Sequence, residues 1–403
     1  MWNKTQPFTV LFCGAALLAL ASCGGGGGGA DTAGATGASA TALGSQQAAT
    51  AGAAAAAAAA AQAPMLGNCE MFPASAIFNT RIDDVSRFPA HPNSAGWIAG
   101  VGHAVPFQAD WGITEDASRP DYWGLPVNTV GAATTQWPTV AYDFAPSGLS
   151  TEVGYPHESD CAVPSGDGFA IQRGCANVPS NSRRFPFPSG NVLAQGGTCN
   201  NPNGCGDHHV LMVEQGACRL WEGYAAYNLS GQWYAMATAA WDLKSLALRP
   251  NGWTAATAAG LPITPLLARA AEASSGEIRH ALGVAFQDGA IARDYVWPAR
   301  HAAGGDNPGA IPFGALLRLK ADFVIPDHWT TQAKALATAA KRYGMYVTDN
   351  GAHFHVGGEP SAQWDINTLT QLRAITMSNM EFVNLNAVTT DPRFSNDSMA
   401  ASW

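Results

Sequence analysis

The stretch that decides the fold reads GDHHVLMVE over residues 206–214, and CRLWEGY follows it over residues 218–224. The apolar run of residues 210–213 is typical of a strand, and the intervening Gln215–Ala217 is short and contains glycine, which favours a turn. We therefore predict a hairpin whose second strand begins near Cys218.

This hairpin brings several chemically active side chains to one face. If Glu214 pairs with Arg219 across the turn, His209 lies opposite Tyr224. Side chains alternate between the two faces of a strand, so every second residue shares a face. The predicted catalytic residues on this shared face are Asp207, His209, Glu222 and Tyr224. A shift of one residue in the register would send His209 and Tyr224 to opposite faces.

A third strand is expected over residues 232–243, beyond a second turn. The same counting brings Ala235 and Ala237 next to Tyr224 and Glu222. Small side chains beside a polar cluster leave room for a ligand, so the sequence predicts a groove on this sheet.

Aromatic and basic side chains flank the predicted groove. Indole rings offer flat faces to sugar rings, and basic groups at the end of a strand can reach a neighbouring cleft. The predicted substrate-binding residues are Trp221, Trp233, Trp241, Arg300 and His301.

The N-terminal residues are typical of a targeting segment. One positive charge, Lys4, precedes the apolar run of residues 8–20, which is too short to span a membrane comfortably. The residues LASC at positions 20–23 resemble the lipobox of bacterial lipoproteins. We predict a signal peptide over residues 1–22 and a lipid on Cys23. The glycine that follows favours anchoring to the outer membrane of a Gram-negative cell.

The rest of the chain divides into a tether and a folded part. Residues 23–66 are rich in Gly and Ala without apolar periodicity, so they predict a low-complexity tether. Residues 67–403 contain most of the 13 Trp, 44 Gly and 25 Pro of a chain that is only 13% charged, which indicates a loop-rich, aromatic-rich β protein. The predicted fold is mainly β, an antiparallel β-sandwich or jelly-roll-like domain with a few peripheral helices. A division into two subdomains near residue 195 is the alternative.

Charge and cysteine content limit the partners and the compartment. The net charge of −9 makes nucleic acid and anionic membrane surfaces poor partners, so the only expected membrane contact is through the lipid at Cys23. Beyond the signal peptide and the lipidated residue, six cysteines remain, an even number that indicates disulfides in an exported chain. Of the fifteen possible pairings, we predict Cys161 with Cys175, Cys199 with Cys205, and Cys69 with Cys218.

Several other polar residues are candidates for a site. Asp110, Asp121 and Asp143 lie beside aromatic residues, where they could line a sugar site or be ordinary solvated turn carboxylates. His353, His355 and Glu359 match the H-x-H-x-x-x-E core of the cupin metal motif. Because no histidine follows His355 to supply a further ligand, we predict no metal and no cofactor.

Short motifs from Phe72 to the C-terminus resemble a family of bacterial exported proteins and lipoproteins that is known only as uncharacterised. The resemblance implies a shared fold and carries no activity to this chain. The matching segments are residues 78–80, 207–210, 220–222, 241–243, 248–253, 260–263, 295–301 and 341–344.

Two functions are compatible with these patterns. The first is a carbohydrate-active enzyme acting on a poly- or oligosaccharide, either a glycoside hydrolase that uses Asp207 and Glu222 or a polysaccharide lyase that uses His209 and Tyr224. We favour the hydrolase because two acidic groups share the predicted face. The alternative is a non-catalytic, glycan-binding or structural lipoprotein of the cell envelope, in which Glu222 is an exposed charge on a wet sheet face.

Overall fold

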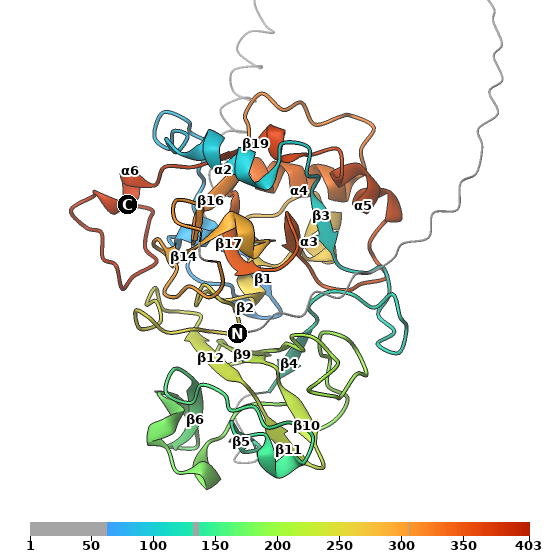
Figure 1. Ribbon diagram of the computed structural model, residues 1–403, viewed down its shortest axis with the longest axis vertical. Helices are drawn as coiled ribbons and strands as arrows, with labels where there is room; N and C mark the ends of the chain where they lie inside the picture. The colour runs from blue at the N-terminus through green and yellow to red at the C-terminus, as the bar shows by residue number, and fades with distance from the viewer. Residues whose placement is uncertain (1–62, 132–136, 306) are drawn as a thin grey trace, which may run out of the picture. The chain divides into compact units, whose positions relative to one another are not determined.

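Short strands make up most of the regular structure in the computed structural model, which describes residues 63–131, 137–305 and 307–403 (Figure 1). Over these residues the strands form several mixed and antiparallel sheets, the largest with six and four strands, and helices are few. This arrangement confirms the prediction of a mainly β chain. The strand orders do not confirm a sandwich or jelly roll.

The predicted hairpin lies at the centre of a four-stranded sheet. Its strands, in order, are β12 (Ala237–Asp242), β9 (Arg219–Tyr224), β8 (Val210–Glu214) and β4 (Val127–Val130). Glu214 pairs with Arg219 and Leu211 with Glu222, so the predicted register is confirmed. Strand β4 runs parallel to β8, and the other neighbours are antiparallel.

The third strand differs from the prediction. Instead of one strand, the chain forms β11 (Gln232–Tyr234) and then β12. Strand β11 belongs to a separate three-stranded sheet with β10 (Tyr227–Leu229) and β5 (Val140–Ala141). The change of sheet at residues 235–236 shifts the pairing by two, so Ala237 faces Tyr224 and Ala239 faces Glu222.

Both faces of the four-stranded sheet are buried. Val213 and Trp241 contribute to the large hydrophobic core, whereas Met212 and Trp221 contribute to a second core on the other side. The alternative in which Glu222 is an exposed charge on a wet sheet face is therefore contradicted, because β8 and most of β9 are buried.

The six-stranded sheet lies within the large core. Its strands, in order, are β19 (Met380–Phe382), β16 (Leu316–Leu319), β17 (Met345–Asn350), β13 (Leu282–Phe286), β18 (His355–Gly357) and β3 (Gln108–Asp110). The pairs β13–β17 and β18–β3 are parallel, and the remaining pairs are antiparallel. Polar side chains at the ends of β3, β17 and β18 contribute to the candidate site described below.

Helix α4 (Thr331–Arg342) packs against β16 and also against α3 (Ala270–Ser275). At its N-cap, the Thr330 hydroxyl accepts a hydrogen bond from the Ala333 amide, and the apolar stripe of the helix is buried. The remaining elements among the described residues are β1 (Met65–Leu66), β2 (Cys69–Glu70), α2 (Ser94–Val101), β6 (Asp160–Ser165), β7 (Gly168–Arg173), β14 (Ile291–Tyr295), β15 (Ile311–Phe313), α5 (Ile366–Leu372), α6 (Asn386–Thr389) and seven short 3-10 turns.

The first strands correct the predicted end of the tether. Strand β1 pairs with β2, and the Met71 amide donates to the Pro64 carbonyl, so the folded chain includes residues that were assigned to the tether. The predicted signal peptide, the lipid site Cys23 and most of the tether lie outside the described residues. None of the helices in the described chain is long and apolar enough to cross a membrane.

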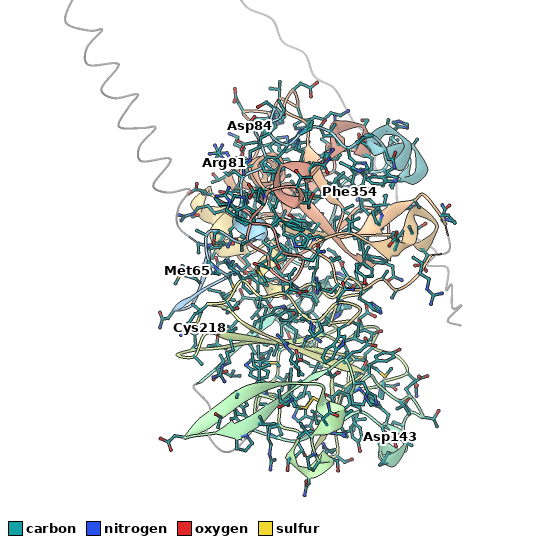
Figure 2. All side chains as sticks on the ribbon, turned by 90° about the vertical axis from the view of Figure 1, so that its left-hand side faces the viewer. Met65, Arg81, Asp84, Asp143, Cys218 and Phe354 are labelled. Carbon is teal, nitrogen blue, oxygen red and sulfur yellow. A yellow bond between two sulfur atoms is a disulfide. The ribbon has the colours of Figure 1, made fainter. Side chains whose placement is uncertain are left out.

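Three disulfides cross-link the described chain, and all three predicted pairings are confirmed. Cys69 is bonded to Cys218, Cys161 to Cys175, and Cys199 to Cys205. The first bond ties β2 to the start of the second strand of the hairpin; Figure 2 shows Cys218 and Met65 on the same side of the molecule.

Candidate functional site

Two adjoining hollows contain most of the polar side chains that the structure gathers in one place. The first has a volume of about 170 Å³ and is lined by residues that include Asp110, His209 and His355. The second has a volume of about 480 Å³ and is lined by residues that include Tyr155, Tyr224 and His301. Four residues line both hollows: Asp207, Thr257, Asp349 and Asn350. We call the two hollows together the Asp207–Asp349 groove.

Asp207 is placed by the irregular backbone just before β8. Gly206 and His208 both have positive φ, at 67° and 42°, and His208 is a rare non-glycine residue in that region. The Ala225 amide donates to the Asp207 carbonyl (2.8 Å), which fixes the backbone beyond the last regular pair of the hairpin. The side chain of Asp207 is exposed and reaches the groove.

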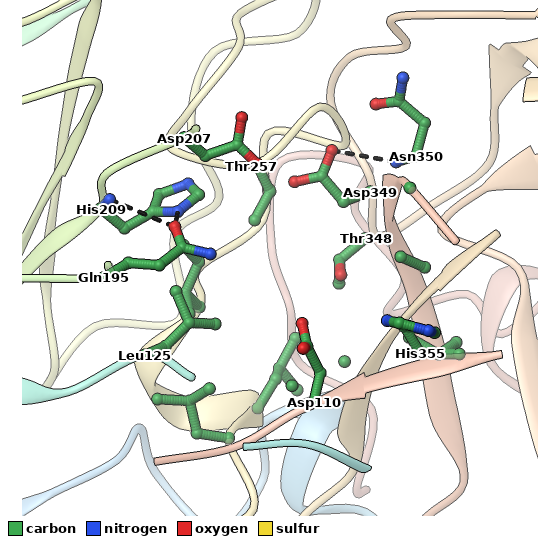
Figure 3. A pocket seen from close by; sticks show the side chains of 18 of the residues that line it. Asp110, Leu125, Gln195, Asp207, His209, Thr257, Thr348, Asp349, Asn350 and His355 are labelled. Atoms are coloured by element: carbon green, nitrogen blue, oxygen red, sulfur yellow. Dashed lines mark hydrogen bonds between the residues drawn. The ribbon is translucent and has the colours of Figure 1, made fainter. Parts of the chain in front are cut away.

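Asp349 is placed by a bulge near the end of β17. The pairing with β13 runs regularly to Val284 and Val347, then skips Thr348 so that Ala285 pairs with Asp349. A bulge puts consecutive side chains on the same side of a strand, and both Thr348 and Asp349 line the first hollow. Figure 3 shows Asp207 and Asp349 on either side of Thr257, with Asp110 below them.

The surroundings of Asp349 favour its protonated form. Burial raises the pKa of this carboxyl group to about 8, and the negative charge of Asp207 adds to the rise. The backbone amides of Asn350 (3.0 Å to Oδ1) and Ala258 donate hydrogen bonds to the carboxyl group and lower its pKa. At neutral pH, Asp349 is therefore mostly a neutral acid that can donate a proton.

Asp110 is a third carboxyl group in the first hollow, at the end of β3. Burial raises its pKa, the neighbouring His355 lowers it, and Asp207 raises it further. Gly357 of β18 is paired with Asp110, which brings the two strand ends to the floor of the hollow. Three carboxyl groups from distant segments thus share one cavity.

His209 forms the wall of the first hollow. Its Nδ1 lies 2.6 Å from Gln195 Oε1 and its Nε2 lies 2.8 Å from the Ala256 carbonyl oxygen. Burial lowers the pKa of His209, while Asp207 and the Ala256 carbonyl act to raise it. A neutral imidazole has one N–H and donates to one of these two oxygens, so His209 acts to position the loops around the groove.

Tyr224 lines the second hollow and lies near His209, with ring centroids 5.6 Å apart. Burial raises the pKa of its phenol, and the charges of Asp207 and Asp349 raise it further. A phenolate base is disfavoured in these surroundings, so Tyr224 serves as a neutral hydroxyl and an aromatic surface.

Glu222 was predicted to be catalytic, but the structure places it outside the groove. Its side chain is fully buried and accepts hydrogen bonds from the amides of Ile263 and Thr264 and from the Thr264 hydroxyl. Burial raises its pKa to about 7 despite these donors. The prediction failed because the loop around Ile263 covers this part of the sheet, which the hairpin pattern does not show.

The predicted tryptophan platform is also contradicted. Trp221 is buried and donates to Glu214, and Trp241 is buried beneath the Arg249 guanidinium. Trp233 belongs to β11 of the three-stranded sheet, and its ring is stacked on Phe187 with ring centroids 4.1 Å apart. These rings face packed cores because both sides of the sheet are covered.

The two predicted basic residues have different positions. Arg300 is buried and donates to the carbonyls of Arg249 and Asn396 and to the Asp397 carboxylate, so its guanidinium is used to hold loops together. His301 lines the second hollow, where its Nδ1 lies 2.8 Å from the Ala258 carbonyl oxygen.

The cupin-like spacing does not assemble a metal centre. His355 reaches the first hollow, whereas Glu359 accepts a hydrogen bond from the Ala270 amide, and His353 Nδ1 lies near the Gln287 amide. Within residues 63–131, 137–305 and 307–403, no three His, Cys, Asp or Glu side chains are grouped so that they could hold a metal ion.

Sequence reasoning missed Gln195 and did not choose Asp349. Asp349 stands in an Asp-Asn-Gly turn signal at the end of a strand, where a functional carboxylate and an ordinary turn residue have the same pattern. Asp110 was named only as one of three candidates. Comparison of the chain with protein-family models, with curated protein sequences and with solved structures gives no match.

Proposed function

We propose that this chain is a lipid-anchored, exported glycoside hydrolase whose acid and base are Asp349 and Asp207. The observation that carries the proposal is the pairing of two carboxyl groups in one groove, where the raised pKa of one keeps it protonated beside the charge of the other. Enzymes that cleave glycosidic bonds need such a pair, with one group as acid and the other as carboxylate.

The chemistry assigns one role to each aspartate. The protonated Asp349 gives its proton to the glycosidic oxygen while the bond from that oxygen to the anomeric carbon breaks. The Asp207 carboxylate takes a proton from a water molecule whose oxygen bonds to the anomeric carbon. The products are two shorter sugars, and exchange of protons with solvent restores both aspartates.

The remaining groove residues suit a ligand rich in hydroxyl groups. Gln195, Thr257 and Thr348 offer neutral polar groups in the first hollow, beside apolar residues such as Leu266 and Leu267. Pockets that combine apolar walls with a few polar groups are typical of small-molecule sites. Asp110, on the floor, is suited to accept a hydrogen bond from a sugar hydroxyl.

The lyase alternative receives less support from the groove. A lyase that acts on uronic acid polymers needs a cation to neutralise the substrate carboxylate and a base that can lose its proton. Among the described residues that line the first hollow, none is Lys or Arg and three are Asp, and Arg293 is the one arginine that lines the second hollow. The raised pKa of Tyr224 also disfavours a tyrosine base.

Assays with soluble polysaccharides test the proposal. The purified chain is incubated with hydroxyethyl cellulose, a mixed-linkage β-glucan, a xylan and a galactomannan, and reducing ends are measured. The expected result is release from at least one polymer, with a loss of about 10²-fold or more in Asp207→Asn and Asp349→Asn. Asp242→Asn, an exposed aspartate on β12 that lines neither hollow, is the matched control and keeps full activity.

Three outcomes would overturn the assignment. Release that is equal in the two variants and the wild type removes both aspartates from the mechanism. An unsaturated sugar released from a polyuronate such as alginate or pectate, detected by its ultraviolet absorbance, would replace the hydrolase with a lyase. A folded chain that binds these polymers without releasing reducing ends would instead be a glycan-binding protein.

A further inference from the structure

The aspartate pair lies where the two hollows meet, rather than at the closed end of one of them. Asp207 and Asp349 line both hollows, and each hollow continues on its own side with residues that the other lacks. A ligand that fills both hollows therefore passes directly over the pair. In an enzyme that accepts only the end of a sugar chain, the acid and base would instead lie at the closed end of a single cavity.

The second hollow carries an exposed aromatic ring on a fixed backbone. Tyr155 is 51% exposed, yet its amide donates to the Met236 carbonyl (2.7 Å) and its carbonyl accepts from the Ser159 hydroxyl (2.8 Å). The neighbouring Gly154 lies so close to Met236 that an added Cβ would be 2.4 Å from its carbonyl oxygen. The close approach holds Tyr155 at the groove, where its ring can stack on a sugar.

The second hollow is also the larger of the two, at about 480 Å³ against about 170 Å³. Its polar lining includes the Tyr224 hydroxyl and the His301 ring, and both are held by packing or hydrogen bonding to the fold. More sugar residues can therefore be held on the Tyr155 side than on the Asp110 side.

We propose that the Asp207–Asp349 groove binds a neutral polysaccharide along its length, with Tyr155 as a stacking surface, and that cleavage occurs inside the chain. This inference rests on the proposed hydrolase function and adds to it a substrate class and a mode of attack. The substrate is a polymer with sugar residues on both sides of the cleaved bond. Polyuronates are disfavoured because the Asp207 carboxylate repels their carboxylates at the centre of the groove, although Arg293 lines the second hollow.

Two measurements on one polymer test the mode of attack. The viscosity of the polymer that the wild type cleaves is followed together with the release of reducing ends. Internal cleavage makes viscosity fall steeply while few reducing ends have formed, and the early products are long oligosaccharides. Release of mono- or disaccharides with a slow fall in viscosity overturns internal cleavage but leaves the hydrolase function standing.

Variants of Tyr155 test the stacking surface. Tyr155→Ala is expected to lower kcat/KM on the polymer about tenfold, mainly through KM, and Tyr155→Phe to keep at least half of it, because the ring is retained. Trp123→Ala is the control, since Trp123 is also an exposed aromatic, 60% accessible, and lines neither hollow. Equal losses in the alanine and phenylalanine variants, or none in either, overturn the role of the ring.

Binding separates the two proposals. The inactive variant Asp349→Asn and the double variant Asp349→Asn/Tyr155→Ala are compared by affinity electrophoresis. Each is run through gels that contain one of the four polymers. Retardation that Tyr155→Ala weakens supports chain binding in the groove even if hydrolysis is never found. Absence of retardation in every gel overturns the binding of a polysaccharide chain, and absence of cleavage by the wild type overturns the hydrolase function.

Discussion

Burial and the charge of Asp207 raise the pKa of Asp349, although the two residues come from distant parts of the chain. Asp207 precedes β8 of the four-stranded sheet, and Asp349 lies near the end of β17 in the six-stranded sheet. The groove between them exists because the hairpin and the bulged strand end next to each other. This relationship leads to the first two predictions.

The first prediction concerns the pH dependence of hydrolysis. Burial and the charge of Asp207 raise the pKa of Asp349 to about 8, so the acid is present below that pH and is lost above it. The rate should therefore fall as the pH rises through about 8, with a tenfold fall for each further unit. Initial rates of hydrolysis, measured on a cleaved polymer at pH values below and above 8, check this prediction. Tryptophan fluorescence at each pH shows whether the chain stays folded. A rate that is unchanged one to two units above pH 8 would remove Asp349 as the acid.

The second prediction concerns the stability of Asp349→Asn. In the folded chain the carboxyl group has a raised pKa, whereas in the unfolded chain it ionises near its ordinary value of 3.8. Stability is therefore lost as the pH rises from about 4 to about 8. Asparagine removes this loss and can still accept from the Asn350 amide. The variant should therefore be more stable than the wild type above pH 8, by about 1–5 kcal/mol, where the upper figure corresponds to the full pKa shift. Near pH 4 the difference should vanish.

Thermal unfolding at several pH values checks the second prediction. The difference in Tm between Asp349→Asn and the wild type should increase steadily from pH 4 to pH 8. Asp242→Asn, on the exposed end of β12, should show no such increase. A variant that is less stable than the wild type at pH 8 would contradict the raised pKa.

The sequence predicted the central hairpin well because its signals are local. The turn at residues 215–217 and the apolar run of β8 fix the register of Glu214 and Arg219, and short-range pairing needs no knowledge of the rest of the chain. The three disulfide pairings were also predicted correctly. Two of the three join cysteines that are close in sequence, and the third pair then follows from the even number.

The site could be predicted only in part, because it depends on contacts between distant segments. Asp207 and His209 were identified from the hairpin, and both line the groove. Asp349 was not identified, since its orientation depends on a bulge against β13. Glu222 was misassigned because the loop at Ile263, which covers it, lies far along the chain. Alternation along a strand predicts which residues share a face, but it does not predict whether that face is open.

The third prediction tests the structural role of Glu222. Glu222→Ala removes the acceptor for the Ile263 and Thr264 amides and leaves these buried donors unsatisfied. The loss should be about 2–4 kcal/mol in the free energy of unfolding. Glu222→Gln retains a side-chain oxygen at the position of Oε1, which accepts three of these bonds, so it should lose about 1 kcal/mol or less.

Chemical denaturation and specific activity together test whether the role of Glu222 is structural or catalytic. Both Glu222 variants should keep the activity of the wild type per folded molecule, because the side chain does not reach the groove. If Glu222→Gln is as stable as the wild type but has lost hydrolysis, Glu222 belongs to the mechanism and the covering loop must open.

The fourth prediction concerns the disulfides, which close loops of very different length. Cys69 and Cys218 are 149 residues apart, whereas Cys199 and Cys205 are 6 apart. A cross-link reduces the entropy of the unfolded chain more when its loop is longer, and the chain-entropy relation gives about 5 kcal/mol for the long loop and about 2 kcal/mol for the short one. Replacing both cysteines of a pair by alanine should therefore destabilise the chain much more for Cys69 and Cys218 than for Cys199 and Cys205. Denaturant unfolding of the two double variants measures the difference. Equal losses would mean that local packing at each bond, rather than the length of the loop, determines its contribution.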